Sequence, residues 1–178
     1  MLIALDASTV ATGFAFGGPG DGVPRGGVWK LPGADELVFD RTLSIVAESL
    51  SALAKMLKAD HVAIEAPLLM VGPNHRAQTA MVLIQLTGAL RAAAHRAGCR
   101  VHLISVQSAR AHFIGHGRLP RDEAKAAVQA RCKALGWPFA DDNQADACAV
   151  WSLAMARIYP KWAPQTGPLF AAAKGGAA

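Results

Sequence analysis

Four carboxylates occupy positions from which they can act together on one ligand. Asp6 and Glu65 each end a short apolar segment that is typical of a buried β-strand. Asp142 and Asp146 are four residues apart at the start of a predicted helix, a spacing that places both side chains on one helical face. If the two strands are parallel neighbours and the helix packs beside them, all four carboxylates meet at one edge of the sheet.

A cluster of this kind repels itself unless cations neutralise it. Carboxylate oxygens are hard ligands, which select Mg²⁺ or Mn²⁺ over softer metals. Two such ions ~4 Å apart can activate a water molecule and stabilise the leaving oxygen when a phosphodiester is cleaved. The candidate chemistry is therefore two-metal hydrolysis of a phosphodiester.

Each carboxylate also has an ordinary structural explanation. An acidic residue after a strand is commonly part of a turn, and Asp141 with Asp142 can cap the final helix, because carboxylates are favoured at its positive end. Glu65 and Asp146, however, are set among apolar residues, where an unpaired charge is costly to bury. These two positions favour the functional interpretation.

Positive charge gathers in the middle of the chain. The net charge is +5, and nine of the 18 Lys and Arg residues lie between positions 91 and 133: Arg91, Arg96, Arg100, Arg110, Arg118, Arg121, Lys125, Arg131 and Lys133. Only Asp122 and Glu123 oppose them. A solvated surface and a polyanionic partner such as nucleic acid both explain this charge, and charge alone leaves the two open.

The hydrophobic pattern predicts strands first and helices later. The predicted strands are Leu2–Leu5, Ala11–Phe16, Gly26–Leu31, His61–Ile64 and Val101–Ile104, and the predicted helices are Asp35–Lys58, Gln78–Ala97, Asp122–Leu135 and Asn143–Ile158. This order predicts an α/β fold with a mixed five-stranded sheet flanked by helices. Residues 1–160 are expected to form one domain, and residues 161–178 a flexible tail.

A membrane span and an exported location are not expected. The longest apolar stretch, Thr79–Leu90, has twelve residues and is closed by Arg91, whereas a span needs ~20. Met1 opens directly into a strand-like segment, without a charged leader. The three cysteines are widely spaced and are interpreted as reduced, packed thiols. A cytoplasmic location is expected.

Three acidic motifs resemble those of RuvC-type Holliday junction resolvases, particularly their phage-like relatives. The matching segments are Leu5-Asp6-Ala7-Ser8-Thr9 with Thr12-Gly13-Phe14-Ala15, then Ile64-Glu65-Ala66-Pro67, and last Asp142-Asn143-Gln144-Ala145-Asp146-Ala147. The resemblance spans roughly residues 2–151. It implies a ribonuclease H-like fold, two Mg²⁺ ions for which Mn²⁺ can substitute, and a homodimer that makes paired nicks in four-way DNA junctions during recombination and repair.

The resemblance assigns the metal ligands, with one departure. Asp6, Glu65 and Asp146 are the implied ligands, and Asp6 is the best candidate to bridge both ions. The family often has a second aspartate three residues before the last one, where this chain has Asn143. Asp142 supplies the carboxylate one position earlier and is the favoured fourth ligand, with Asn143 as the alternative.

The basic segment resembles the one that precedes the final helices in this family. Arg110, His116 and Arg118 are expected to contact DNA phosphates from a loop that also contains His112. Arg121 stands where the family has a lysine near the scissile phosphate, and Lys125 follows one turn later. Because arginine does not donate its proton, charge stabilisation rather than acid catalysis is expected there. Such phosphate contacts position a strand without reading its sequence.

Several alternatives remain open. The apolar helix Gln78–Ala97 favours a homodimer, although a core helix of a monomer has the same pattern. A nuclease of the same fold can act on RNA or RNA–DNA hybrids, as ribonuclease H and YqgF-type relatives do, and a binding module can have lost catalysis. An actin-like ATPase or sugar kinase needs two such domains and a second phosphate turn, so no nucleotide cofactor is expected.

Overall fold

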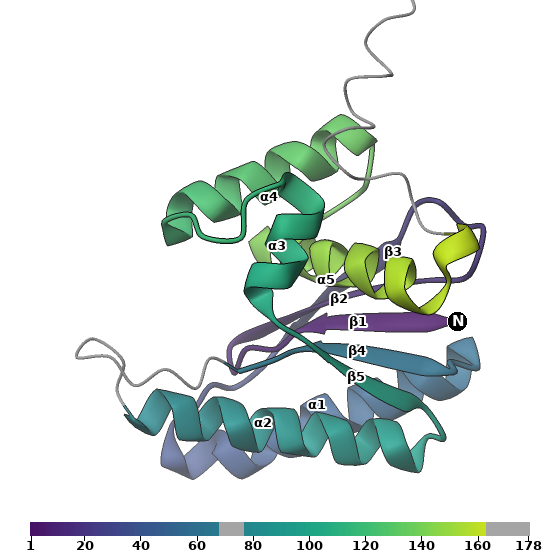
Figure 1. The fold of residues 1–178 in the computed structure, drawn as a ribbon. Coiled ribbons are helices and arrows are strands. Elements are labelled where there is room, and N and C mark those ends of the chain that lie inside the picture. Colours follow the sequence, from purple (N-terminus) through teal and green to yellow (C-terminus); the bar gives the residue numbers. More distant parts are fainter. Residues whose placement is uncertain (68–76, 163–178) are drawn as a thin grey trace, which may run out of the picture.

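A central sheet carries helices on both of its faces (Figure 1). The structure is a computed structural model that describes residues 1–67 and 77–162. The strands are β1 (Leu2–Asp6), β2 (Ala11–Gly17), β3 (Arg25–Lys30), β4 (His61–Glu65) and β5 (Arg100–Ile104). The helices are α1 (Glu36–Leu57), α2 (Ala77–Arg96), α3 (Val106–Ile114), α4 (Arg121–Leu135), α5 (Asp142–Ile158) and the short 3-10 helix η1 (Pro160–Trp162).

The sheet has the mixed topology that the sequence predicted. Its strand order is β3-β2-β1-β4-β5. β1 pairs antiparallel with β2, and β2 with β3, whereas β1 with β4 and β4 with β5 are parallel. Leu5 lies beside Ile64 in the parallel pair, so Asp6 and Glu65 end adjacent strands at the same edge of the sheet. The predicted meeting of these two side chains at one edge is confirmed.

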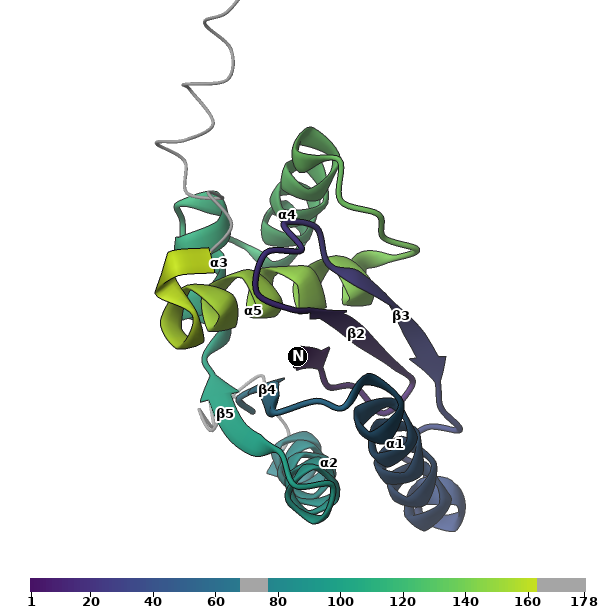
Figure 2. The same ribbon diagram turned by 90° about the vertical axis from the view of Figure 1, so that its right-hand side faces the viewer.

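Helices α1 and α2 lie on one side of the sheet and α3, α4 and α5 on the other (Figure 2), and each face buries a separate hydrophobic cluster. Ile3 and Leu5 belong to the cluster beneath α1 and α2, and Leu2 and Ala4 to the cluster beneath α3, α4 and α5. Because side chains alternate along a strand, Asp6 faces the same side as Leu2 and Ala4. Glu65 likewise follows the alternation of Ala63 in β4, so both carboxylates lie on the α5 side.

One expectation was wrong: residues 106–114 form the helix α3 rather than part of a basic loop. The side chain of Ser105 caps this helix by accepting from the amide of Ser108, at 3.2 Å. Val106, Ala109 and Phe113 are buried, which is helical spacing. Arg110 and His112 are therefore helical residues whose directions are set by the packing of α3.

Other expectations about the fold are confirmed or lie beyond the described residues. Cys99, Cys132 and Cys148 are buried free thiols. None of the helices within residues 1–67 and 77–162 combines the length and the apolar character needed to cross a membrane. The predicted tail begins in η1, and residues 163–178 lie outside the described part of the chain.

Two glycines of β2 allow α5 to lie directly on the sheet. A Cβ atom on Gly13 would stand 2.1 Å from the backbone oxygen of Asn143, and one on Gly17 would stand 2.7 Å from the ring of Trp151. Gly13 is also the register partner of Asp6. The missing side chain at Gly13 therefore brings the first turn of α5 close to the strand that carries Asp6.

Gly13→Ala is expected to lower the free energy of unfolding by about 1–3 kcal/mol, because the added methyl group overpacks a backbone contact. The measurement is urea unfolding followed by circular dichroism. Gly18→Ala is the matched control, since a Cβ there would meet its nearest atom at 3.7 Å. Equal stability of the two variants would show that α5 does not depend on this contact.

Candidate active site

Asp6, Glu65 and Asp146 form one electrostatic cluster at the edge where β1 and β4 end. Burial raises the pKa of Asp6 well above its usual range, and the charges of Glu65 and Asp146 raise it further. Burial also raises the pKa of Glu65 to about 7, with a further contribution from Asp146. Three carboxylates that oppose one another's ionisation form a site that attracts a cation.

Asp146 reaches the cluster from α5. The helix begins after Asp141, whose side chain accepts a hydrogen bond from the amide of Gln144 at 2.9 Å. Asp146 follows in the second turn and is only 8% exposed. Burial raises its pKa, while Arg110 and Lys125 oppose that rise. The capping role considered for Asp141 is thus correct. Asp146 is a separate, buried acid in the next turn of the helix.

Asp142 lies at the rim of the cluster rather than inside it. Its carboxylate accepts a hydrogen bond from the ammonium group of Lys125 in α4, which lowers the pKa of Asp142. Its side chain is 33% exposed. The negative charge of Asp142 raises the pKa of Asp146, so the two acids of α5 are neighbours as their spacing predicted.

Asn143 is engaged with the start of the helix. Its side-chain amide donates to the carboxylate of Asp141 at 3.2 Å, and its backbone oxygen faces Gly13. In this arrangement, Asp142 is the residue of the two that offers a carboxylate next to Asp146.

Arg110 lies among the carboxylates, a position that the sequence did not indicate. Its Nη2 is 3.6 Å from an oxygen of Asp146, and its Nε is buried without a hydrogen-bond partner among the described residues. Its charge opposes the raised pKa of Asp6 and of Glu65 as well. The helical pattern of Val106, Ala109 and Phe113 was the signal that could have placed Arg110 on the α5 side.

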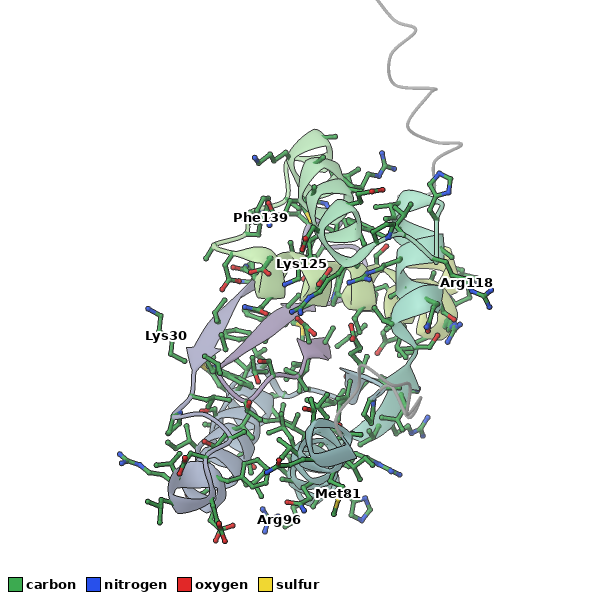
Figure 3. All side chains as sticks on the ribbon, turned by 90° about the vertical axis from the view of Figure 1, so that its left-hand side faces the viewer. Lys30, Met81, Arg96, Arg118, Lys125 and Phe139 are labelled. Carbon is green, nitrogen blue, oxygen red and sulfur yellow. The ribbon has the colours of Figure 1, made fainter. Side chains whose placement is uncertain are left out.

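The remaining basic residues are arranged around this cluster. Figure 3 looks onto the edge where β1 and β4 end, with Lys125 above the sheet and Arg118 to one side. Arg121 is an exposed residue one turn before Lys125 on α4. His116 and Arg118 line an open depression of about 530 Å³ together with Gln107 and Ser108. Lys125 and Arg110 therefore contact the acids, and the other predicted cations lie farther out.

His112 was expected in a loop, but this residue lies on α3 and its side chain packs toward α5. Its Nε2 lies 3.1 Å from the hydroxyl oxygen of Ser152 in α5. Burial lowers its pKa, and the charge of Arg157 lowers it further. This histidine belongs to the packing between α3 and α5.

The donor set has the chemistry of a site for a hard divalent cation. Asp6, Glu65, Asp142 and Asp146 all offer carboxylate oxygens, and burial raises the pKa of Asp6 and of Glu65. No three Asp, Glu, His or Cys side chains within residues 1–67 and 77–162 are already placed to hold a metal ion. Asp142 is paired with Lys125 and Asp146 with Arg110.

Comparison with solved structures identifies the fold. Thermus thermophilus RuvC matches with a TM-score of 0.62 and 20% sequence identity over 88% of this chain and 95% of that one. T. thermophilus RuvC in complex with Holliday junction substrate matches with a TM-score of 0.62 and 18% identity, covering 84% and 88% of the two chains. The yeast mitochondrial Holliday junction resolvase matches with a TM-score of 0.59 and 13% identity, covering 92% and 83%.

No protein-family model and no curated protein sequence matches this chain. The likeness is therefore one of structure at low sequence identity. It confirms the ribonuclease H-like fold that the acidic motifs implied, in the form that RuvC has.

Glu65→Gln is expected to change how stability depends on pH in the metal-free protein. Because folding raises the pKa of Glu65 from 4.5 to about 7, its contribution to stability is present below pH 4.5 and is lost as the pH rises through 7. The variant should escape this loss, which amounts to up to about 3 kcal/mol. Urea unfolding in EDTA at pH 5 and pH 8 measures this loss of stability in the unsubstituted protein and in the variant.

The control for this prediction is Glu48→Gln, which removes an exposed glutamate of α1. The stability difference between Glu65→Gln and the unsubstituted protein should grow with pH, whereas that of the control should stay constant. A pH-independent difference for Glu65→Gln would contradict the burial of its charge in a repulsive cluster.

Proposed function

We propose that this chain is a metal-dependent endodeoxyribonuclease that hydrolyses phosphodiesters in branched DNA and resolves four-way junctions by paired nicks. The observation that carries the proposal is the cluster of Asp6, Glu65 and Asp146 at one sheet edge of a RuvC-like fold. The solved complex of T. thermophilus RuvC with Holliday junction substrate supports four-way DNA as the substrate class.

The proposed metal ligands are Asp6, Glu65 and Asp146, with Asp142 as the fourth. The charges of Glu65 and Asp146 raise the pKa of Asp6, which supports Asp6 as a ligand that would share one metal site with them. When bound, two Mg²⁺ or Mn²⁺ ions supply the activation of water and the neutralisation of charge on the leaving oxygen. The contribution of the protein to this chemistry is to hold these carboxylates together on β1, β4 and α5.

The proposed phosphate contacts lie on α3, α4 and the segment between them. Lys125 and Arg110 are next to the carboxylates, so they are suited to the phosphate at the cut. Arg121, which is exposed one turn from Lys125, and His116 with Arg118 can extend the contact along the backbone. These contacts recognise phosphate charge and position the strand, and they do not read the bases.

A homodimer accounts for paired nicks. The described residues of one chain form one acidic cluster, whereas two of the four strands of a junction must be cut. Met81 and Ile84 lie three residues apart on α2 and are 60% and 46% exposed, and Met81 projects outward in Figure 3. Leu103 of the edge strand β5 is 44% exposed. Leu103 lies two residues after Val101, which packs on the α2 side of the sheet, so both side chains face that side. These apolar residues support α2 and β5 as the dimer surface.

Ile84→Glu is expected to weaken self-association at least about tenfold, because it places a charge in an apolar interface. Sedimentation equilibrium measures the dissociation constant. Gln85→Glu on the neighbouring exposed position is the control and should change it little. A monomer at all concentrations for the unsubstituted chain would refute the proposed dimer.

A cleavage assay tests the activity directly. A four-way junction, a fork, a linear duplex and an RNA–DNA hybrid are incubated with the protein and Mg²⁺, and the strands are separated on denaturing gels. Symmetric nicks in the junction are expected, with little cutting of the linear duplex. Hybrid cutting without junction cutting would instead identify a nuclease of the ribonuclease H or YqgF type.

Asp6→Asn should lower junction cleavage by more than about 100-fold, because it removes the central carboxylate ligand. Asp40→Asn, which changes an exposed aspartate of α1, should leave cleavage unchanged. Cleavage that survives Asp6→Asn would show that the acidic cluster is not the active site.

A further inference from the structure

Two positively charged side chains already form ion pairs with the acids of α5. Lys125 of α4 donates to Asp142, and the guanidinium of Arg110 of α3 lies 3.6 Å from Asp146. These are the acids that the proposed metal site requires.

Both cations act on the whole cluster and not only on their nearest partner. Lys125 and Arg110 each lower the pKa of Asp6 and of Asp146. Four carboxylates and two protein cations leave two uncompensated negative charges when all are ionised. One divalent ion neutralises that remainder, so a second ion is favoured only if the protein cations turn to another anion.

Both ion pairs are partly accessible to solvent. The side chains of Lys125 and Asp142 are 24% and 33% exposed, and that of Arg110 is 16% exposed. Arg110 has an unfilled donor at Nε, and its contact with Asp146 is longer than a good hydrogen bond. A phosphate group can accept two parallel hydrogen bonds from a guanidinium, and it also attracts an ammonium group. A phosphate group can therefore compete with Asp146 for the guanidinium of Arg110.

We propose that Lys125 and Arg110 couple metal binding to DNA binding by exchanging carboxylate for phosphate. In the free protein the two cations hold Asp142 and Asp146. When a DNA phosphate arrives, they turn to it and release both carboxylates, which completes the binding site for the second divalent ion. This inference rests on the proposed function and assigns Lys125 and Arg110 as positioning residues for the metal ligands, besides their contact with phosphate.

The first test measures metal affinity without DNA. Mn²⁺ is titrated into the unsubstituted protein, Lys125→Gln and Arg110→Gln, and bound ion is followed by calorimetry and by electron paramagnetic resonance. Each variant should bind Mn²⁺ about tenfold more tightly, because a competing cation has been removed. Lys133→Gln on α4 and Arg96→Gln on α2 are exposed controls and should not change the affinity. A merely structural role for Lys125 or Arg110 would leave the affinity unchanged or weaken it.

The second test measures coupling. The affinity for a four-way junction is determined by gel shift in EDTA and in Ca²⁺, with strand integrity checked on denaturing gels. By reciprocity, Ca²⁺ should tighten junction binding by the same factor by which the junction tightens Ca²⁺ binding, about tenfold or more. Lys125→Gln should reduce that factor to about two or three. Thermal unfolding with and without Mn²⁺ confirms that each variant folds, and Lys125→Gln is informative even if Arg110→Gln does not fold.

The outcomes separate this inference from the proposed function. If Mn²⁺ binds but Lys125→Gln and a folded Arg110→Gln bind it no more tightly, the counter-ion role is wrong and the nuclease proposal stands. If Ca²⁺ and the junction bind independently, the coupling is wrong. If the unsubstituted protein binds no Mn²⁺ with or without the junction, the metal-dependent function itself is wrong.

Discussion

Mutual repulsion among buried carboxylates is the constraint on which the α5 side of the molecule depends. Three acids are held at one sheet edge, where burial and their neighbours' charges raise their pKa values. Such an arrangement is unstable by itself, and two features oppose the repulsion. The apolar body of α5 is packed on the sheet, and cations from α3 and α4 reach the cluster from above. The helices over this face thus serve both as its hydrophobic cover and as its source of positive charge.

The local pattern of the amino-acid sequence was sufficient to predict most of the fold. The apolar segments of β1 and β4 and the acids at their ends predict the sheet edge, and the spacing of Asp142 and Asp146 predicts their common face. α3 was missed because the segment is short and polar and basic residues interrupt its apolar positions. Its recognisable signals are the Ser105 cap and the buried positions three and four residues apart.

Which charged side chains form ion pairs with one another could not be predicted from the local sequence pattern. The pairing of Lys125 with Asp142 joins residues of two different helices, and it depends on how α4 crosses α5. Arg110 was assigned to a DNA-facing loop because only its charge was visible, whereas its direction follows from the rotation of α3 about its axis. Spacing predicts which residues share one helical face, but tertiary packing decides what that face meets.

The contact between Gly13 and the first turn of α5 joins main chain to main chain. Such a contact contains no side-chain torsions, so the separation between the backbones of β1, β2 and α5 is insensitive to rotamer changes. The exchange of partners proposed for Lys125 and Arg110 would therefore need rotation about χ angles alone, without moving the helix or breaking the core beneath it. A reorganisation confined to a few side chains is fast compared with movements of whole elements.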